Sequence, residues 1–221
     1  MIERSGPKPS EQFMKALLTL DRLAVEKMLV AAYEESGLEG MSRTLVAPAL
    51  ERIGDDWTEG KVSLSEVYMS SRICEQLVRP LGSRDDQHKK KQPKIAIAAL
   101  QDYHLLGKKI VQLVLQSAGY ELLDYGQGIS VDNLVARVIK DRPVDVLLIS
   151  TLMLPSALKV KPLREKLNQA GVTKIKIAVG GAPFRFDREL WREVGADASG
   201  ITASDALAIV DGLSQEVTRA A

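Results

Sequence analysis

A carboxylate and an imidazole stand two residues apart in the middle of the chain, at Asp102 and His104. They follow an apolar run, residues 95–100, that is typical of a buried strand, and the apolar periodicity of residues 108–118 predicts a helix after them. Both side chains should therefore lie at the carboxyl end of a strand, where open α/β sheets bind their ligands.

This pair of side chains suits a particular kind of metal chemistry. A histidine that donates one ring N–H to a carboxylate presents its other ring nitrogen to a metal. One histidine supplies one bond, so His104 fits the axial position of a metal that a macrocycle already holds. The alternative is a hydrogen-bonded loop pair without a ligand, because motifs this short often occur without a function.

Further motifs follow the Asp-x-His-x-x-Gly pattern of residues 102–107: Ser-Thr-Leu at 150–152 and Gly-Gly at 180–181. In this order the three motifs resemble those of cobalamin-binding domains of the methionine synthase, corrinoid methyltransferase and mutase group. Asp-Tyr-Gly at 124–126 resembles the Asp-x-Gly that these domains carry at the end of their second strand. The resemblance implies a cobalamin (corrinoid) cofactor.

The resemblance also implies a role for each motif residue. His104 would be the axial ligand of the cobalt in place of the corrinoid's own nucleotide base, with Asp102 bonded to its other nitrogen and Ser156 extending the relay. The detached nucleotide tail would run beside small or lining residues of the domain. These residues are Gly107, Gly126, Ser150, Leu152, Gly180 and Gly181.

Some of these positions have other readings, and one departs from the family. Each glycine could be an ordinary turn residue, and Ser150 could be a strand-end hydroxyl that caps a turn. Gln127 and Gly128 stand where methionine synthase-like chains have apolar residues. This wall of the tail channel is therefore expected to be looser, or to contact the tail differently.

From residue 94 onward, apolar strand patterns alternate with helical ones, which predicts an α/β fold. The expected architecture is a flavodoxin-like (Rossmann-like) sheet of five parallel strands with right-handed crossovers. Strands are expected over residues 95–100, 120–125, 144–151, 174–179 and 198–201. Helices are expected over residues 108–118, 131–140, 157–170, 187–194 and 205–213.

The N-terminal part has helical periodicity and should form a bundle of four or five short helices. We expect a helical cap domain over residues 1–82, a charged linker over 83–93 and the cobalamin-binding domain over 94–221. In the family such a cap covers the reactive face of the corrin, and Leu64 and Tyr68, one helical turn apart, would shield it. The same spacing also fits the core of a bundle, and Trp57 is expected to be a core anchor.

Composition limits the classes of function. The 221 residues include 45% hydrophobic and 27% charged residues, and the net charge of +1 gives no electrostatic argument for nucleic acid or a membrane surface. Cys74 has no second cysteine with which to form an internal disulfide, and no apolar run resembles a signal peptide or a membrane span. These features predict a cytoplasmic protein.

Several functions share this type of domain. A mutase would need a substrate barrel and a transcriptional photoreceptor a DNA-binding domain, and neither pattern occurs in the sequence; Val67 also stands where such photoreceptors have a second histidine. We therefore expect a carrier of methyl groups between a methyl-donor methyltransferase and a methyl-acceptor methyltransferase, served by a reductive activator. The donor could be a methoxylated aromatic (O-demethylation), methanol, a methylamine or a betaine, and the acceptor tetrahydrofolate or a similar compound.

Three alternatives remain beside the methyl carrier. The chain could be a cobalamin-binding sensor or a storage protein without turnover, or a flavodoxin-like interaction domain that binds no corrinoid. A homodimer is a separate expectation, which is compatible with the carrier and with each alternative. In each case the sequence predicts a binding protein rather than a complete enzyme.

Overall fold

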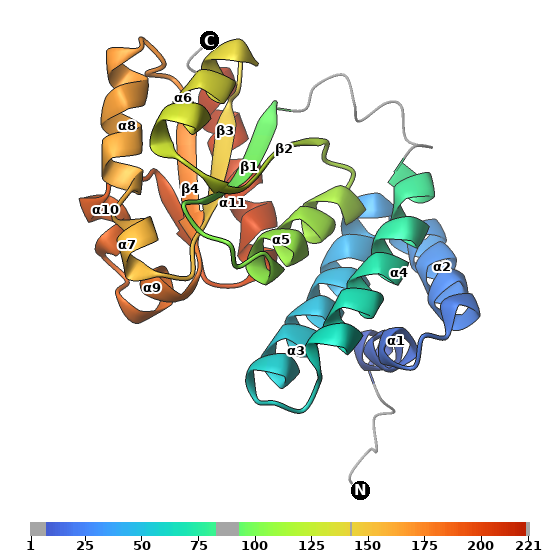
Figure 1. Cartoon of the computed structure of the whole chain (residues 1–221). Helices are drawn as coiled ribbons and strands as arrows, with labels where there is room; N and C mark the ends of the chain where they lie inside the picture. The colour runs from blue at the N-terminus through green and yellow to red at the C-terminus, as the bar shows by residue number, and fades with distance from the viewer. Residues whose placement is uncertain (1–7, 83–92, 142, 220–221) are drawn as a thin grey trace, which may run out of the picture. The chain divides into compact units, whose positions relative to one another are not determined.

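The computed structural model describes residues 8–82, 93–141 and 143–219 (Figure 1). The chain divides into two compact units, Met1–Lys90 with Leu113–Tyr120 and Lys91–Gln112 with Glu121–Ala221. We call them the helical unit and the sheet unit. The predicted linker lies outside the described residues except for Pro93, so its role as a hinge stays a prediction.

The helical unit is built from apolar helix faces, as predicted. Its buried core includes Phe13, Leu17, Val25, Leu29 and Leu50. The helices are α1 (Pro9–Leu18), α2 (Arg22–Met41), α3 (Ala47–Thr58) and α4 (Leu64–Gly82), with a π-helical turn, η1 (Ser42–Val46), between α2 and α3.

The helical unit also contains a segment that the sequence did not assign to it. The last residues of α5 (Leu106–Ser117) group with this unit. The buried Ser42 hydroxyl donates to the main-chain oxygen of Val114 at 3.0 Å and accepts from the Ser117 hydroxyl at 2.7 Å. Serine is common in exposed helices, and nothing in the sequence marks these two as partners in a buried pair.

The sheet unit confirms the predicted fold, with five parallel strands in the order β2-β1-β3-β4-β5. The strands are β1 (Ile95–Leu100), β2 (Leu122–Ile129), β3 (Val146–Ser150), β4 (Lys176–Gly180) and β5 (Ala198–Gly200). The remaining helices of the unit are α6 (Val131–Lys140), α7 (Leu154–Ala157), α8 (Val160–Gln169), α9 (Ala182–Phe186), α10 (Leu190–Glu193) and α11 (Ala203–Arg219).

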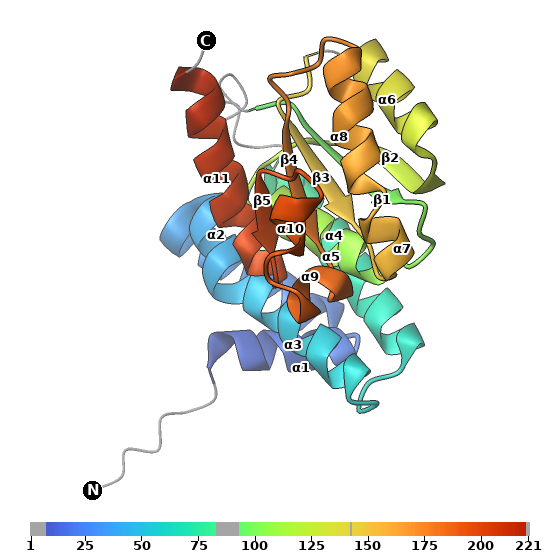
Figure 2. The same cartoon turned by 90° about the vertical axis from the view of Figure 1, so that its left-hand side faces the viewer.

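Helices cover both faces of the sheet. Figure 2 shows α6 and α8 on one face and α11 on the other. All residues of β1 are buried, which is why this strand reads as a continuous apolar run. On the face of α6 and α8, Leu134 and Leu163 pack with strand residues such as Leu147 in one apolar cluster. The cluster fixes the strands, and thereby the positions of the loops at their ends.

The predicted elements differ from the observed ones in the second half of the sheet unit. The helix expected over residues 157–170 is observed as α8, preceded by the short α7, and the one expected over 187–194 is observed as the shorter α10, preceded by α9. Pro155 and Pro162 each stand in the first turn of a helix, where a missing N–H costs nothing, so each allows a separate helix start. Strand β2 continues through Gly126 and Gly128, beyond its predicted end at residue 125, with irregular pairing to β1.

Helix ends follow the expected local signals. The Ser130 side chain accepts a hydrogen bond from the Asn133 N–H at 3.3 Å and caps α6. Among the described residues, no helix combines the length and the apolar character needed to cross a bilayer.

We predict that Leu134→Ala lowers the free energy of unfolding by about 2–5 kcal/mol, because Leu134 is fully buried between α6 and the sheet. Ile139→Ala on the same helix is the matched control. Its side chain is 42% exposed, so the loss should stay below about 1 kcal/mol. Urea unfolding followed by circular dichroism measures both, and equal losses would contradict the assigned packing of α6.

Candidate functional site

The loop after β1 carries the candidate site, and main-chain bonds tie it to β2. Gln101 turns the chain out of the strand with a positive φ of 47°, which is rare for a residue other than glycine. The Gln101 N–H donates to the main-chain oxygen of Ile129 at 3.0 Å, and the Gly128 N–H donates to the main-chain oxygen of Asp102 at 2.8 Å. These bonds fix the start of the loop.

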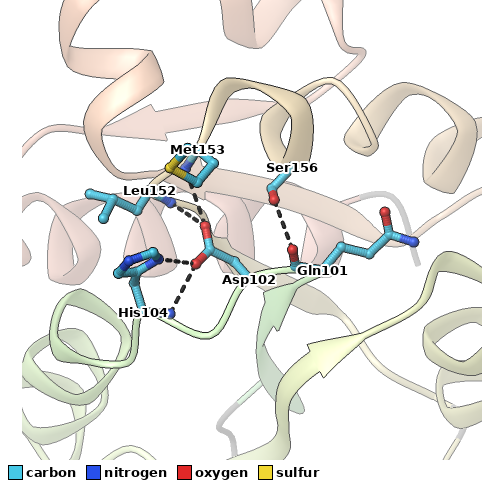
Figure 3. A network of polar contacts seen from close by, with 6 residues as sticks. All are labelled: Gln101, Asp102, His104, Leu152, Met153 and Ser156. Carbon is cyan, nitrogen blue, oxygen red and sulfur yellow. Dashed lines mark hydrogen bonds and ion pairs between the residues drawn. The ribbon is translucent and has the colours of Figure 1, made fainter.

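The Asp102 carboxylate is the centre of a hydrogen-bond network (Figure 3). Its Oδ1 lies 2.9 Å from the His104 main-chain nitrogen and 2.7 Å from His104 Nδ1. Its Oδ2 accepts from the main-chain N–H groups of Leu152 at 2.6 Å and Met153 at 3.2 Å. One side chain thus joins the loop after β1 to the loop after β3.

The network sets the charge of Asp102 and the tautomer of the neutral His104 ring. Burial by itself would raise the pKa of Asp102, but the hydrogen bonds from His104, Leu152 and Met153 outweigh it and hold the pKa below its ordinary value. An ionised carboxylate only accepts hydrogen bonds, so His104 Nδ1 carries a proton. Nε2 is then the nitrogen with a free lone pair, and the His104 side chain is 59% exposed.

This geometry agrees with an axial ligand to a metal that something else holds. In the described part of the chain, no group of three or more His, Cys, Asp or Glu side chains lies close enough to hold a metal ion. His104 offers one oriented nitrogen that is accessible from outside. The carboxylate behind the ring strengthens that nitrogen as a donor.

Two hydroxyl groups lie beside the network. We expected Ser156 to extend the relay, but its hydroxyl donates to the Gln101 main-chain oxygen at 2.9 Å instead of to Asp102. Thr151 is 2% exposed, and its hydroxyl has no hydrogen-bond partner among the described residues. Because unpaired buried hydroxyls are costly, Thr151 is a candidate contact for a bound molecule.

The glycines of the motifs have different local surroundings. A side chain at Gly181 would place its Cβ 1.7 Å from the Thr151 oxygen, and the φ of 118° also excludes other residues. Gly181 is therefore required by the loop after β3. At Gly107 a Cβ would meet the Ser150 hydroxyl at 3.7 Å, which is ordinary contact, so packing within the chain does not require a glycine there.

The remaining predicted glycines lie at the same edge of the sheet. Gly180 is at the end of β4, where a Cβ would lie 3.3 Å from the Gly200 oxygen. Gly126 has a positive φ of 86° with open space around it. The structure thus brings all motif positions to the carboxyl edge, while their contact with a corrinoid stays a prediction.

Large apolar side chains around His104 are exposed. Leu152 is 43% exposed, Met153 52% and Leu154 53%, and Tyr103 in the loop after β1 is 74% exposed. Exposed apolar side chains that gather in one place mark a surface that another molecule covers. Together with the unpaired Thr151 hydroxyl and the oriented imidazole, they fit a large, partly apolar ligand such as a corrinoid.

Sequence reasoning missed one charged residue at this edge, Lys108. It is 3% exposed, and its Nζ lies 2.5 Å from Asp124 Oδ1 and 3.4 Å from the Gly126 oxygen. Asp124 Oδ1 also accepts the Gly126 N–H at 2.8 Å. A lysine at the third position of α5 suggests an exposed residue, and nothing in its spacing indicates burial.

The predicted cap residues lie on the helical unit. Leu64 is 63% and Tyr68 51% exposed, so the alternative that they are bundle core is wrong. Trp57, expected to be a core anchor, is 39% exposed, and that prediction is wrong as well. Buried neighbours such as Val67 fill the core instead.

Comparisons with known proteins show the family to which the chain belongs. Residues 93–211 match the family model of the B12 binding domain, and residues 10–81 match a second model described in the same words. The trimethylamine corrinoid protein of Methanosarcina barkeri is 30% identical over 168 residues, which are 73% of this chain and 75% of that protein. A corrinoid protein of Desulfitobacterium hafniense is 26% identical over 212 residues, 91% of this chain and 95% of that protein.

Solved structures share the fold. The monomethylamine corrinoid protein of Methanosarcina barkeri has a TM-score of 0.65 at 21% identity, covering 91% of this chain and 96% of that chain. A cobalamin-binding protein from Desulfitobacterium hafniense has a TM-score of 0.62 at 19% identity, covering 92% and 97%.

We predict that Asp124→Asn destabilises the cofactor-free protein more than Lys108→Met does. The asparagine leaves a buried ammonium without its counter-charge, at a cost of about 3 kcal/mol, whereas Lys108→Met leaves a carboxylate that is 39% exposed and that water can solvate, at about 1 kcal/mol. Urea unfolding gives both values.

Lys166→Met is the control for this comparison, because Lys166 pairs with Asp132 at the surface of the same unit and should contribute less than about 1 kcal/mol. A larger loss for Lys108→Met than for Asp124→Asn would contradict the assigned burial of the lysine.

Proposed function

The chain belongs to the B12-binding family of corrinoid proteins, and from this premise we propose that it carries a methyl group between two partner methyltransferases. The observation that carries the proposal is the Asp102–His104 pair, with Nδ1 held by the carboxylate and the ring exposed. When bound, the corrinoid cobalt supplies the chemistry, because it accepts and releases a methyl group.

The residues of the site have distinct tasks in this proposal. His104 binds the cobalt through Nε2, and Asp102 keeps the proton on Nδ1 and strengthens the ring as a donor. A proton gained by the His104–Asp102 pair weakens that donor, so the pair tunes the ligand strength. Ser150, Thr151 and Gly107 border the nucleotide tail.

Apolar side chains exclude water in this proposal. Leu152 and Met153 are exposed, and in this proposal a bound corrin covers them. Leu64 and Tyr68 of the helical unit shield the reactive face, and their exposure in the described structure is what such a role requires.

The partners follow from what the chain contains. One methyltransferase loads the methyl group, a second passes it to tetrahydrofolate or a similar acceptor, and a reductive activator restores the cofactor. The names of the relatives support a methylamine as donor, and they give no support to O-demethylation. A cytoplasmic location and a homodimer belong to the same proposal.

We predict that the spectrum of protein reconstituted with hydroxocobalamin depends on His104. His104→Ala should shift the ultraviolet-visible bands of the bound corrinoid, because the nitrogen ligand is lost. Asp102→Asn keeps the ring but replaces the ionised acceptor, so a smaller shift is expected. Lys161→Ala, an exposed residue of α8, is the control. Identical spectra for His104→Ala and the wild type would contradict axial ligation, and colourless protein would contradict corrinoid binding altogether.

We also predict that methyl transfer requires partners. Protein loaded with cobalamin and a reductant should consume mono- or trimethylamine only after a cognate methyltransferase is added, measured as methylated cofactor by its absorbance. Consumption of the amine by the protein alone would contradict the carrier function. Tight binding of adenosylcobalamin with weak binding of methyl- and hydroxocobalamin would instead support a sensor.

A further inference from the structure

A groove of about 520 Å³ lies between α6 and the end of β2. Figure 2 shows α6 beside β2 in the sheet unit, and the two elements are in contact. The polar residues that line the groove, together with Gly128, are Tyr125, Gln127, Asn133, Arg137 and Lys140. The site described above uses none of the side chains that come from α6.

The charge of the groove comes from one face of α6. Asn133, Arg137 and Lys140 are spaced four and three residues apart, so they share a face, and all three are exposed. Neither Arg137 nor Lys140 forms an ion pair with a described residue. Other cations of the sheet unit do have carboxylate partners, including Lys108, Arg164, Lys166 and Lys176. The unpaired cations therefore favour an anionic ligand.

Tyr125 gives the groove a buried hydrogen-bonding group. The residue is 5% exposed, and its hydroxyl lies near the Asp141 carboxylate without a hydrogen bond of good geometry to any described residue. Burial, together with the nearby Asp141 carboxylate, raises the pKa of Tyr125, so the hydroxyl keeps its proton and is able to donate. The Arg137 guanidinium carbon lies 5.9 Å from the centre of the Tyr125 ring. The carboxylate of Asp141 balances one of the two positive charges of Arg137 and Lys140, so a net positive charge stays on this face of α6.

The strand that borders the groove has a free edge. Among the described strands, β2 pairs with β1 alone and is the outermost strand of the sheet. The open edge of a strand offers main-chain donors and acceptors to an extended peptide. A free edge beside a basic helix face therefore suits an extended segment that carries acidic side chains.

Main-chain bonds connect the groove to the loop of His104. Gly128 lines the groove, and its N–H donates to the main-chain oxygen of Asp102 at 2.8 Å. Ile129 accepts from the Gln101 N–H at 3.0 Å. A molecule bound in the groove thus touches the residues that hold the corrinoid loop in place.

We propose that this groove is a docking site for an extended acidic segment of a partner protein that works on the bound cofactor. The segment places its carboxylates on Arg137 and Lys140 and lies along the outer edge of β2. The identity of the partner as a methyltransferase or activator rests on the proposed function, whereas the chemistry of the groove does not.

The test uses a fluorescently labelled hexaglutamate peptide and the full chain loaded with cobalamin. At low ionic strength, where surface charge pairs are least screened, the fluorescence anisotropy should show saturable binding. Arg137→Glu with Lys140→Glu should weaken it about tenfold or more, since attraction becomes repulsion. The matched control is Lys161→Glu with Lys174→Glu, two exposed lysines outside the groove with the same change in charge, and it should stay near the wild type.

Equal weakening of peptide binding by the two double variants would overturn the proposal, because binding would then respond to net charge alone. The absence of peptide binding to the wild type would overturn it as well. Tyr125→Phe keeps the ring and should weaken binding by a smaller factor. If inorganic phosphate displaces the peptide completely at equal charge concentration, the groove is a small-anion site and the docking proposal fails. The corrinoid spectrum of the Arg137→Glu/Lys140→Glu protein should match the wild type, which separates a failure here from a failure of cofactor binding.

Discussion

The buried carboxylate of Asp102 is the interaction on which the rest of the site depends. It accepts hydrogen bonds from His104 on one side and from the main chain of Leu152 and Met153 on the other. A carboxylate with 1% exposure would be unstable without such partners, and the N–H groups would be unsatisfied without the carboxylate. The same bonds that make its burial possible therefore hold the two loops in register and orient the imidazole.

A second buried charge, the ammonium group of Lys108, also holds the loop between β1 and α5. Lys108 reaches from the first turn of α5 to Asp124 and Gly126 in the middle of β2. A cation near a helix N-terminus is unfavourable by itself, so the ion pair with Asp124 compensates for both the helix dipole and the burial. Asp102 ties the loop toward β3 and Lys108 ties it toward β2. His104 lies between these two restraints, which suits a ligand that must keep one direction.

The arrangement is possible because β1 is a central strand. Its neighbours β2 and β3 run parallel to it, so the carboxyl ends of all three meet at one edge of the sheet. The match to the B12 binding domain covers residues 93–211, which include this edge, and the use of the edge for a corrinoid is part of the proposed function. The groove at α6 and β2 shares Gly128 with the same edge, so a partner that docks there would act next to the loop and not at a distant surface.

The sequence by itself determined the fold class, the five strands and the motif Asp102-x-His104, because these depend on local patterns: buried strands read as apolar runs, and a motif depends on residue type and spacing. Tertiary structure alone decided the partners of each side chain. Ser156 bonds to Gln101 and not to Asp102, Lys108 is buried, and the Thr151 hydroxyl has no partner in the described part of the chain, since each outcome depends on which loops meet in space. Tertiary structure also decided the exposure of Trp57. The sequence position of an aromatic residue on a helix is the same whether or not other parts of the protein cover it.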